Sequence, residues 1–226
     1  RMNTVATADN VRAFAPDFAI VATGAAPRPA PFDTTALAAH IRLLHAWDYL
    51  GDPARIASPA RVLIVGGGMV GMEVADLLLA RGGVHVTVLE MTASVAQGMA
   101  RNNRMELIER VQARGGRILT ETHITAVRAD SIETRTRAGE TGAVEIGDVL
   151  MIAIGPKPVR DAVAGLEAAG VPYELAGDCY RPGDFLTALR DASMVALSVE
   201  RRPAAKTEQA ASMPRAAAQG ERGGSR

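Results

Sequence analysis

The stretch RVLIVGGGMVGMEV, residues 61–74, decides the fold. An apolar, β-branched run enters a glycine-rich turn, and an apolar helical pattern leaves the turn and continues to Arg81, where Gly82-Gly83 ends it. A second apolar run follows over residues 85–89. This order predicts a strand, a helix and a second, parallel strand, which is one β-α-β unit.

The glycine spacing matches the G-x-G-x-x-G pattern of dinucleotide-binding turns. In that pattern the first glycine permits the sharp turn, the second lets a pyrophosphate approach the backbone, and the third lets the helix pack against the strand. The N-terminus of the helix then offers free N–H groups to the phosphates. The predicted pyrophosphate site consists of six consecutive residues: Gly66, Gly67, Gly68, Met69, Val70 and Gly71.

An acidic residue closes the unit. Glu90 follows Gly71 by 19 positions, at the end of the second strand, where a carboxylate accepts hydrogen bonds from ribose hydroxyls and repels a 2′-phosphate. Glu90 therefore favours NAD(H) over NADP(H), and the adjacent Met91 belongs to the predicted cofactor site. Two alternatives stay open: Glu90 could be only a polar strand end, and S-adenosylmethionine enzymes also place an acid here.

The rest of the chain predicts further alternation of strands and helices. A buried strand over residues 17–22 precedes a proline-rich extended loop, and a weakly amphipathic helix is expected over residues 35–48. The remaining expectations are a helix at 102–114, a strand at 117–120, an antiparallel meander at 122–145, a strand at 148–154, a helix at 159–169, a strand at 173–176 and a helix at 184–199.

Composition excludes several classes of protein. The apolar runs are much shorter than the roughly 20 residues of a membrane-spanning helix, and no secretion signal begins the chain, so we expect a cytoplasmic protein without membrane contact. The single cysteine, Cys179, and four scattered histidines predict no metal site. Residues 201–226 are basic and poor in bulky apolar side chains, which predicts a disordered tail, while the rest is mildly acidic and predicts no nucleic-acid binding.

Three further motifs place a glycine at a strand end: Ala22-Thr23-Gly24, Ala153-Ile154-Gly155 and Ala176-Gly177-Asp178. With them, residues 10–200 resemble the two-dinucleotide-domain flavoproteins, in which an NAD(P)-binding domain is inserted into an FAD-binding domain. The chain is most similar to the C-terminal module of NADH:flavin oxidoreductases related to 2-enoate reductase, 2,4-dienoyl-CoA reductase and trimethylamine dehydrogenase. Residues 16–27, 71–73, 86–91 and 177–182 carry this resemblance.

The resemblance implies an α/β fold, with a Rossmann-like parallel sheet and an antiparallel β-meander inserted in an incomplete FAD-type domain. It implies a partial FAD-type domain at residues 1–57, an NAD(P)-binding domain at 58–154 and a return to the FAD-type domain at 155–200. Thr23-Gly24 would mark the crossover between the domains, Gly155 would lie at the cofactor, and Gly177-Asp178 would meet the FAD ribityl chain. The implied cofactors are NAD(H) and FAD.

Departures from the resembling proteins limit the functional expectation. No strand and G-x-G-x-x-G turn precedes residue 18, and no paired-cysteine motif is present, so thiol–disulfide exchange is not expected. We therefore expect a fragment of an NADH-dependent flavin oxidoreductase that passes hydride to FAD, with a small organic substrate reacting at a separate FMN and iron–sulfur barrel. A non-catalytic NAD(H)- or ADP-binding module is the alternative. No residue is identified as catalytic.

Overall fold

A computed structural model describes residues 1–201, which divide into two compact units. The central unit comprises Thr23–Val159 and Asp178–Pro182. The flanking unit combines Arg1–Ala22 and Arg160–Gly177 with the described residues from Gly183 onward. The disordered tail predicted for residues 201–226 lies, from residue 202, outside the described residues. The functional domain boundaries given above stay a prediction.

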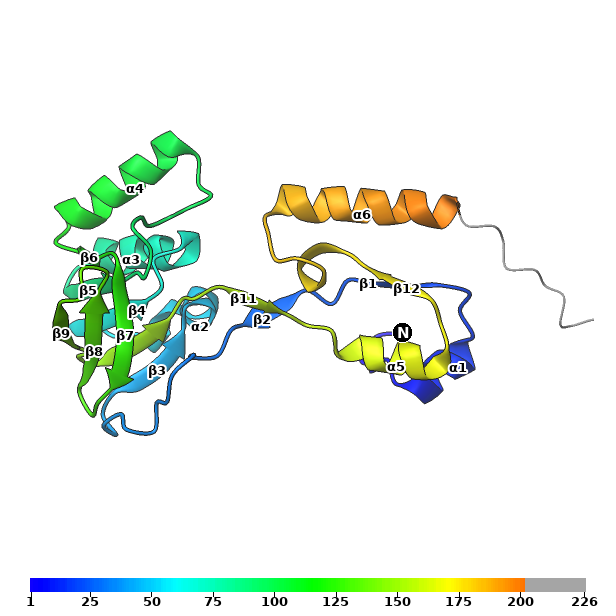
Figure 1. Cartoon of the computed structure of the whole chain (residues 1–226), viewed down its shortest axis with the longest axis horizontal. Helices are drawn as coiled ribbons and strands as arrows, with labels where there is room; N and C mark the ends of the chain where they lie inside the picture. The colour runs from blue at the N-terminus through cyan, green and yellow to red at the C-terminus, as the bar shows by residue number, and fades with distance from the viewer. Residues whose placement is uncertain (202–226) are drawn as a thin grey trace, which may run out of the picture. The chain divides into compact units, whose positions relative to one another are not determined.

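A five-stranded parallel sheet forms the core of the central unit (Figure 1). Its order is β3 (Arg42–His45), β10 (Val149–Ile152), β4 (Ala60–Val65), β5 (Val84–Leu89) and β6 (Arg117–Leu119). The inner strands β10 and β4 are buried throughout except at Arg61, as near-continuous apolar sequences require of strands covered on both faces.

Alternate residues of the strands enter two hydrophobic clusters on opposite faces of the sheet. Val62 and Ile64 pack with the helices α3 (Met69–Ala80) and α4 (Arg101–Ala113). Leu63 and Val65 pack instead with the antiparallel meander, whose strands are β7 (Thr122–Val127), β8 (Ser131–Thr136) and β9 (Thr141–Glu145). The predicted fold class, an α/β protein with a parallel sheet and an antiparallel meander, is confirmed.

The chain order of these strands creates a reversal point in the sheet. The chain proceeds from β4 to β5 and β6 on one side and then returns through the meander to β10 on the other side of β4. In open α/β sheets, ligands bind outside the carboxyl ends of the strands at such a reversal. The carboxyl ends of β4 and β10 are therefore the first place to look for a site.

The predicted helix over residues 35–48 is wrong. Residues 42–45 form the edge strand β3, in which Leu43 and Leu44 are in register with Leu150 and Met151 of β10. The helix α2 begins only at Ala46 and ends at Gly51, and the short 3-10 turn η1 (Pro53–Arg55) follows. Pairing with a fully buried strand outweighed a weak helical periodicity.

The proline-rich segment also differs from the extended loop that the sequence predicts. Its β2 strand (Ala25–Pro27) pairs antiparallel with β11 (Pro156–Pro158), in the connections at the two ends of the central unit. Proline fits such a two-stranded ribbon, because its missing N–H can face away from the partner strand.

The flanking unit contains a two-stranded parallel sheet of β1 (Ala19–Val21) and β12 (Tyr173–Leu175), together with the helices α1 (Ala8–Phe14), α5 (Asp161–Ala169) and α6 (Phe185–Glu200). Asp184 caps α6 by accepting hydrogen bonds from the hydroxyl and the amide of Thr187, and these bonds lower the pKa of Asp184. Apolar side chains of α6 stay exposed, including Phe185 at 79%. A two-stranded sheet with this exposed surface is small for an independent core.

Candidate functional site

The turn between β4 and α3 lies at the reversal point of the sheet and is tightly packed against β10. Gly66 has a φ of +106°, and a Cβ built on it would lie 2.5 Å from the carbonyl oxygen of Ala153. A Cβ on Gly71 would lie 2.0 Å from the carbonyl oxygen of Gly66. Only glycine fits at either position, so both residues bring helix, turn and neighbouring strand together.

Gly68 is different, because a Cβ built on it would meet no atom of the chain within 4 Å. This residue is the N-cap of α3, and no side chain caps the helix there. The first amides of a helix have no partner within the helix, and the positive end of the helix dipole lies beside them. The open space at Gly68 therefore adjoins unoccupied N–H donors, which is the arrangement that binds a phosphate group.

Glu90 lies next to this turn, at the carboxyl end of β5, and only 9% of it is exposed. Its Oε2 accepts a hydrogen bond of 2.7 Å from the amide of Gly67. A Cβ on Gly67 would lie 3.0 Å from the Cβ of Glu90, so the second of the three consecutive glycines permits the close approach of Glu90. The structure thus brings together the glycines and the acid that the sequence singles out.

The other oxygen of the same carboxylate is held by a residue that the sequence reasoning missed. Both the amide and the hydroxyl of Thr92 lie 2.8 Å from Oε1 of Glu90 and donate to it. Gln97 in turn donates from Nε2 to the Thr92 hydroxyl at 3.0 Å. A threonine two positions after an acid is a local turn signal that could have identified Thr92. Nothing in the local pattern points to Gln97.

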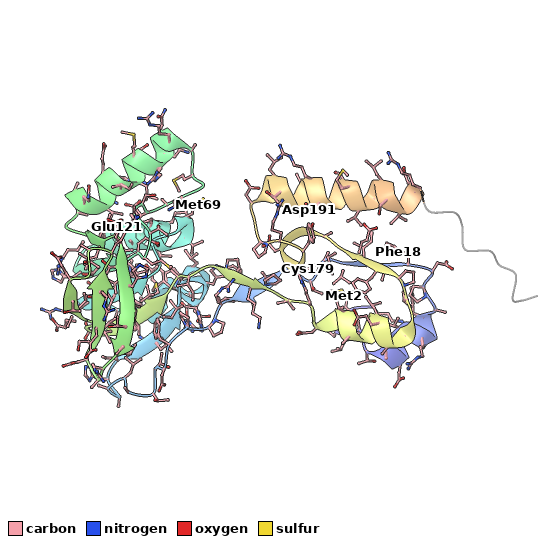
Figure 2. The ribbon with its side chains drawn as sticks, viewed as in Figure 1. Met2, Phe18, Met69, Glu121, Cys179 and Asp191 are labelled. Carbon is pink, nitrogen blue, oxygen red and sulfur yellow. The ribbon has the colours of Figure 1, made fainter. Side chains whose placement is uncertain are left out.

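The remaining predicted residues of the turn lie around this core. Met69, the first residue of α3 and labelled in Figure 2, has a side chain that is exposed, whereas Val70 is half-buried. Met91 is 62% exposed and directly follows Glu90. These side chains offer apolar surface beside the glycine turn, without a polar group that could act on a substrate.

Thr23, Gly24 and Gly155 occupy the connections beside the β2–β11 ribbon. The hydroxyl of Thr23 donates to the carbonyl of Val159, and the Val159 amide donates to the carbonyl of Gly24 at 3.0 Å. Gly155 has a φ of +85° and accepts a hydrogen bond of 3.1 Å from the amide of Arg28. These bonds join the two connecting segments to each other, and a cofactor role for the three residues stays a prediction.

Gly177 and Asp178 belong to the 3-10 turn η2 (Gly177–Cys179), which follows β12. Gly177 has a φ of +66° and lies in the flanking unit, whereas the glycine turn lies in the central unit. Asp178 is half-buried, and Cys179 is fully buried. Burial gives Cys179 the character of a small core residue.

One hollow of the central unit lies away from the glycine turn. A cavity of about 320 Å³ is lined at the amino ends of β4, β5 and β6 by residues that include Arg61, His85 and Arg117. Since ligands of parallel sheets bind at the opposite, carboxyl ends, this cavity is not the candidate site.

Residues 1–201 contain no group of three or more His, Cys, Asp or Glu side chains that could hold a metal ion. Among the helices described, none has the length and apolar character needed to cross a bilayer.

Comparison with known proteins decides the family. The family model described as pyridine nucleotide-disulphide oxidoreductase matches residues 2–179. The chain belongs to this family. Its members are oxidoreductases that bind FAD and NAD(P)H, which sets aside the S-adenosylmethionine alternative.

Individual relatives are consistent with this membership. The chain is 32% identical over 179 residues to bilirubin reductase of Mediterraneibacter gnavus, and the alignment covers 79% of this chain and 27% of that protein. It is 29% identical over 205 residues to NADH oxidase of Thermoanaerobacter brockii, and this alignment covers 88% of this chain and 30% of the relative. The chain thus spans less than a third of the length of these relatives.

Solved structures share the fold. Histamine dehydrogenase from Rhizobium sp. 4-9 superposes with a TM-score of 0.73 at 17% identity, over 88% of this chain and 33% of that one. A 2-naphthoyl-CoA reductase gives a TM-score of 0.67 at 22% identity, over 84% of this chain and 28% of the other.

Proposed function

We propose that the central unit binds NAD(H) and that the chain is the part of a flavin oxidoreductase in which hydride passes from the nicotinamide to FAD. The observation that carries this proposal is the open space at Gly68, beside the uncapped N-terminus of α3 and close to the carboxylate of Glu90. The space is suited to a pyrophosphate, and the carboxylate to a ribose.

The chain's own residues bind and orient rather than react. The amides at the start of α3 would neutralise the pyrophosphate charge, and Glu90 would accept a hydrogen bond from the adenosine ribose and disfavour a 2′-phosphate. Asp178 and Gly177 would contact the ribityl chain of the FAD. When bound, the nicotinamide and the flavin supply the hydride chemistry, so the protein needs no acid or base for that step.

The class of the substrate is proposed here from the relatives. Bilirubin reductase and NADH oxidase are redox proteins more than three times as long as the part that the chain matches. We propose that electrons leave the flavin for a small organic substrate at a separate domain or subunit, such as an FMN and iron–sulfur barrel.

A spectroscopic experiment tests hydride transfer to a flavin. The full chain is expressed, supplied with FAD, freed of unbound cofactor and examined without oxygen before and after addition of NADH. We expect a retained flavin band that bleaches with NADH, and we expect Asp178→Asn to retain less FAD than Gly142→Ala, a control on the exposed strand β9.

A colourless chain that still binds NADH, with Asp178→Asn unchanged, would contradict the flavin role. The second candidate, a module that holds NAD(H) or ADP without turnover, would then be favoured. The specific observation behind that candidate is the flanking unit, whose described residues form a parallel sheet of only two strands.

A further inference from the structure

The carboxylate of Glu90 has most of its hydrogen-bonding capacity filled by the protein. An ionised carboxylate offers about four lone-pair sites. The amide and the hydroxyl of Thr92 take two of these on Oε1, and the amide of Gly67 takes one on Oε2. One acceptor site on Oε2 remains for a ribose hydroxyl.

The hydroxyl of Thr92 has a second acceptor within reach, the carbonyl oxygen of Ser94 at 3.0 Å. Its single proton can serve only one of them, and Oε1 of Glu90 is both nearer, at 2.8 Å, and charged. Gln97 reinforces the choice, because its Nε2 donates to the Thr92 hydroxyl and, at 3.1 Å, to the Ser94 carbonyl. The Thr92 proton is therefore directed towards Glu90.

The same loop is joined to the glycine turn. The amide of Ala96 donates to the carbonyl of Gly67 at 2.7 Å, while the amide of Gly67 donates to Glu90, so the loop, the turn and the carboxylate are bonded together. The side chain of Glu90 is thus fixed by donors on both oxygens and has little freedom to rotate away from a ligand.

We propose that Thr92, supported by Gln97, is a positioning residue that sets the preference of this chain for NADH over NADPH. The inference rests on the proposed NAD(H) site. A carboxylate fixed beside the ribose presents its charge to any 2′-phosphate, whereas one released from Thr92 can swing out and let the phosphate enter. Thr92 acts through Glu90 and does not itself need to contact the dinucleotide.

Equilibrium titrations of the full chain with NADH and with NADPH, at one ionic strength, test the proposal. The quantity compared is the ratio of the NADPH dissociation constant to the NADH dissociation constant. We expect Thr92→Ala to lower this ratio about tenfold and Gln97→Ala to lower it about threefold, through weaker orientation of Glu90. Thr92→Ser keeps the hydroxyl and should restore the wild-type ratio.

Two features of the design separate positioning from a merely structural effect. Thr141→Ala, at an exposed threonine of β9, is the matched control and should leave the ratio unchanged. In a double-variant cycle, Thr92→Ala should lower the ratio little further once Glu90→Ala is present, because both changes act through one carboxylate. Melting temperatures report whether each variant folds, and Gln97→Ala and Thr92→Ser supply the test if Thr92→Ala does not.

The outcomes distinguish this inference from the proposed function. If Glu90→Ala lowers the ratio but Thr92→Ala and Gln97→Ala leave it unchanged, the positioning role is wrong while the NAD(H) site stands. Failure of Thr92→Ser to restore the ratio also overturns the positioning role. If the wild-type chain binds NADPH more tightly than NADH, the NAD(H) assignment itself fails.

Discussion

Gly68→Ala should weaken NADH binding about a hundredfold while leaving the melting temperature of the chain unchanged. The added Cβ meets no atom of the chain within 4 Å, and the φ of −64° at Gly68 suits alanine, so the fold has no reason to respond. The space that the methyl group would fill is the one assigned to the pyrophosphate. A Cβ there blocks the approach of the phosphates to the amides of α3.

Fluorescence titration with NADH and a thermal melt measure these two quantities on one preparation. Gly142→Ala is the control, because a Cβ at this exposed position of β9 makes only an ordinary contact of 3.6 Å. Full NADH affinity in Gly68→Ala would mean that the dinucleotide does not cross the turn at this residue, and the proposed site would have to be abandoned.

Gly71→Ala should have the opposite profile, with a large loss of stability. Its Cβ would lie 2.0 Å from the carbonyl oxygen of Gly66 and 3.3 Å from the Cβ of Ala153, so α3 must move away from both β4 and β10. Overpacking of this kind costs about 3 kcal/mol, which corresponds to a fall of about 10 °C in the melting temperature of a unit of this size.

Circular dichroism melts check this expectation, with Gly68→Ala as the internal comparison on the same turn. The difference between the two variants is more informative than either melting temperature alone. Gly68→Ala is expected to lose NADH affinity, whereas Gly71→Ala is expected to lose stability. A Gly71→Ala chain that melts with the wild type would show that the close packing of α3 on the turn is not required for folding.

Part of the candidate site could be predicted from the sequence, namely the positions at which the backbone geometry allows only one type of residue. Gly66 and Gly71 are imposed by contacts shorter than a Cβ allows, and such requirements appear in the sequence as fixed spacing. Glu90 could be predicted for a similar reason. The two parallel strands of the β-α-β unit end side by side, so the residue that follows the second strand lies next to the glycine turn that follows the first. The parallel sheet and the meander followed from apolar periodicity.

Elements that depend on distant partners could not be predicted in the same way. β3 is a strand because β10, more than a hundred residues later, provides its hydrogen bonds, and no local pattern contains that information. Thr92 and Gln97 were missed because their roles arise from the path of one loop around Glu90. Short local runs fix neither a pairing partner nor a side-chain network.

The account is tested most directly by titrating the unaltered chain with NADH and, separately, with NADPH. We expect saturable binding of NADH, with NADPH bound more weakly because the fixed and nearly buried carboxylate of Glu90 would face a 2′-phosphate in the proposed site. Tighter binding of NADPH, or no saturable binding of either dinucleotide, would contradict it.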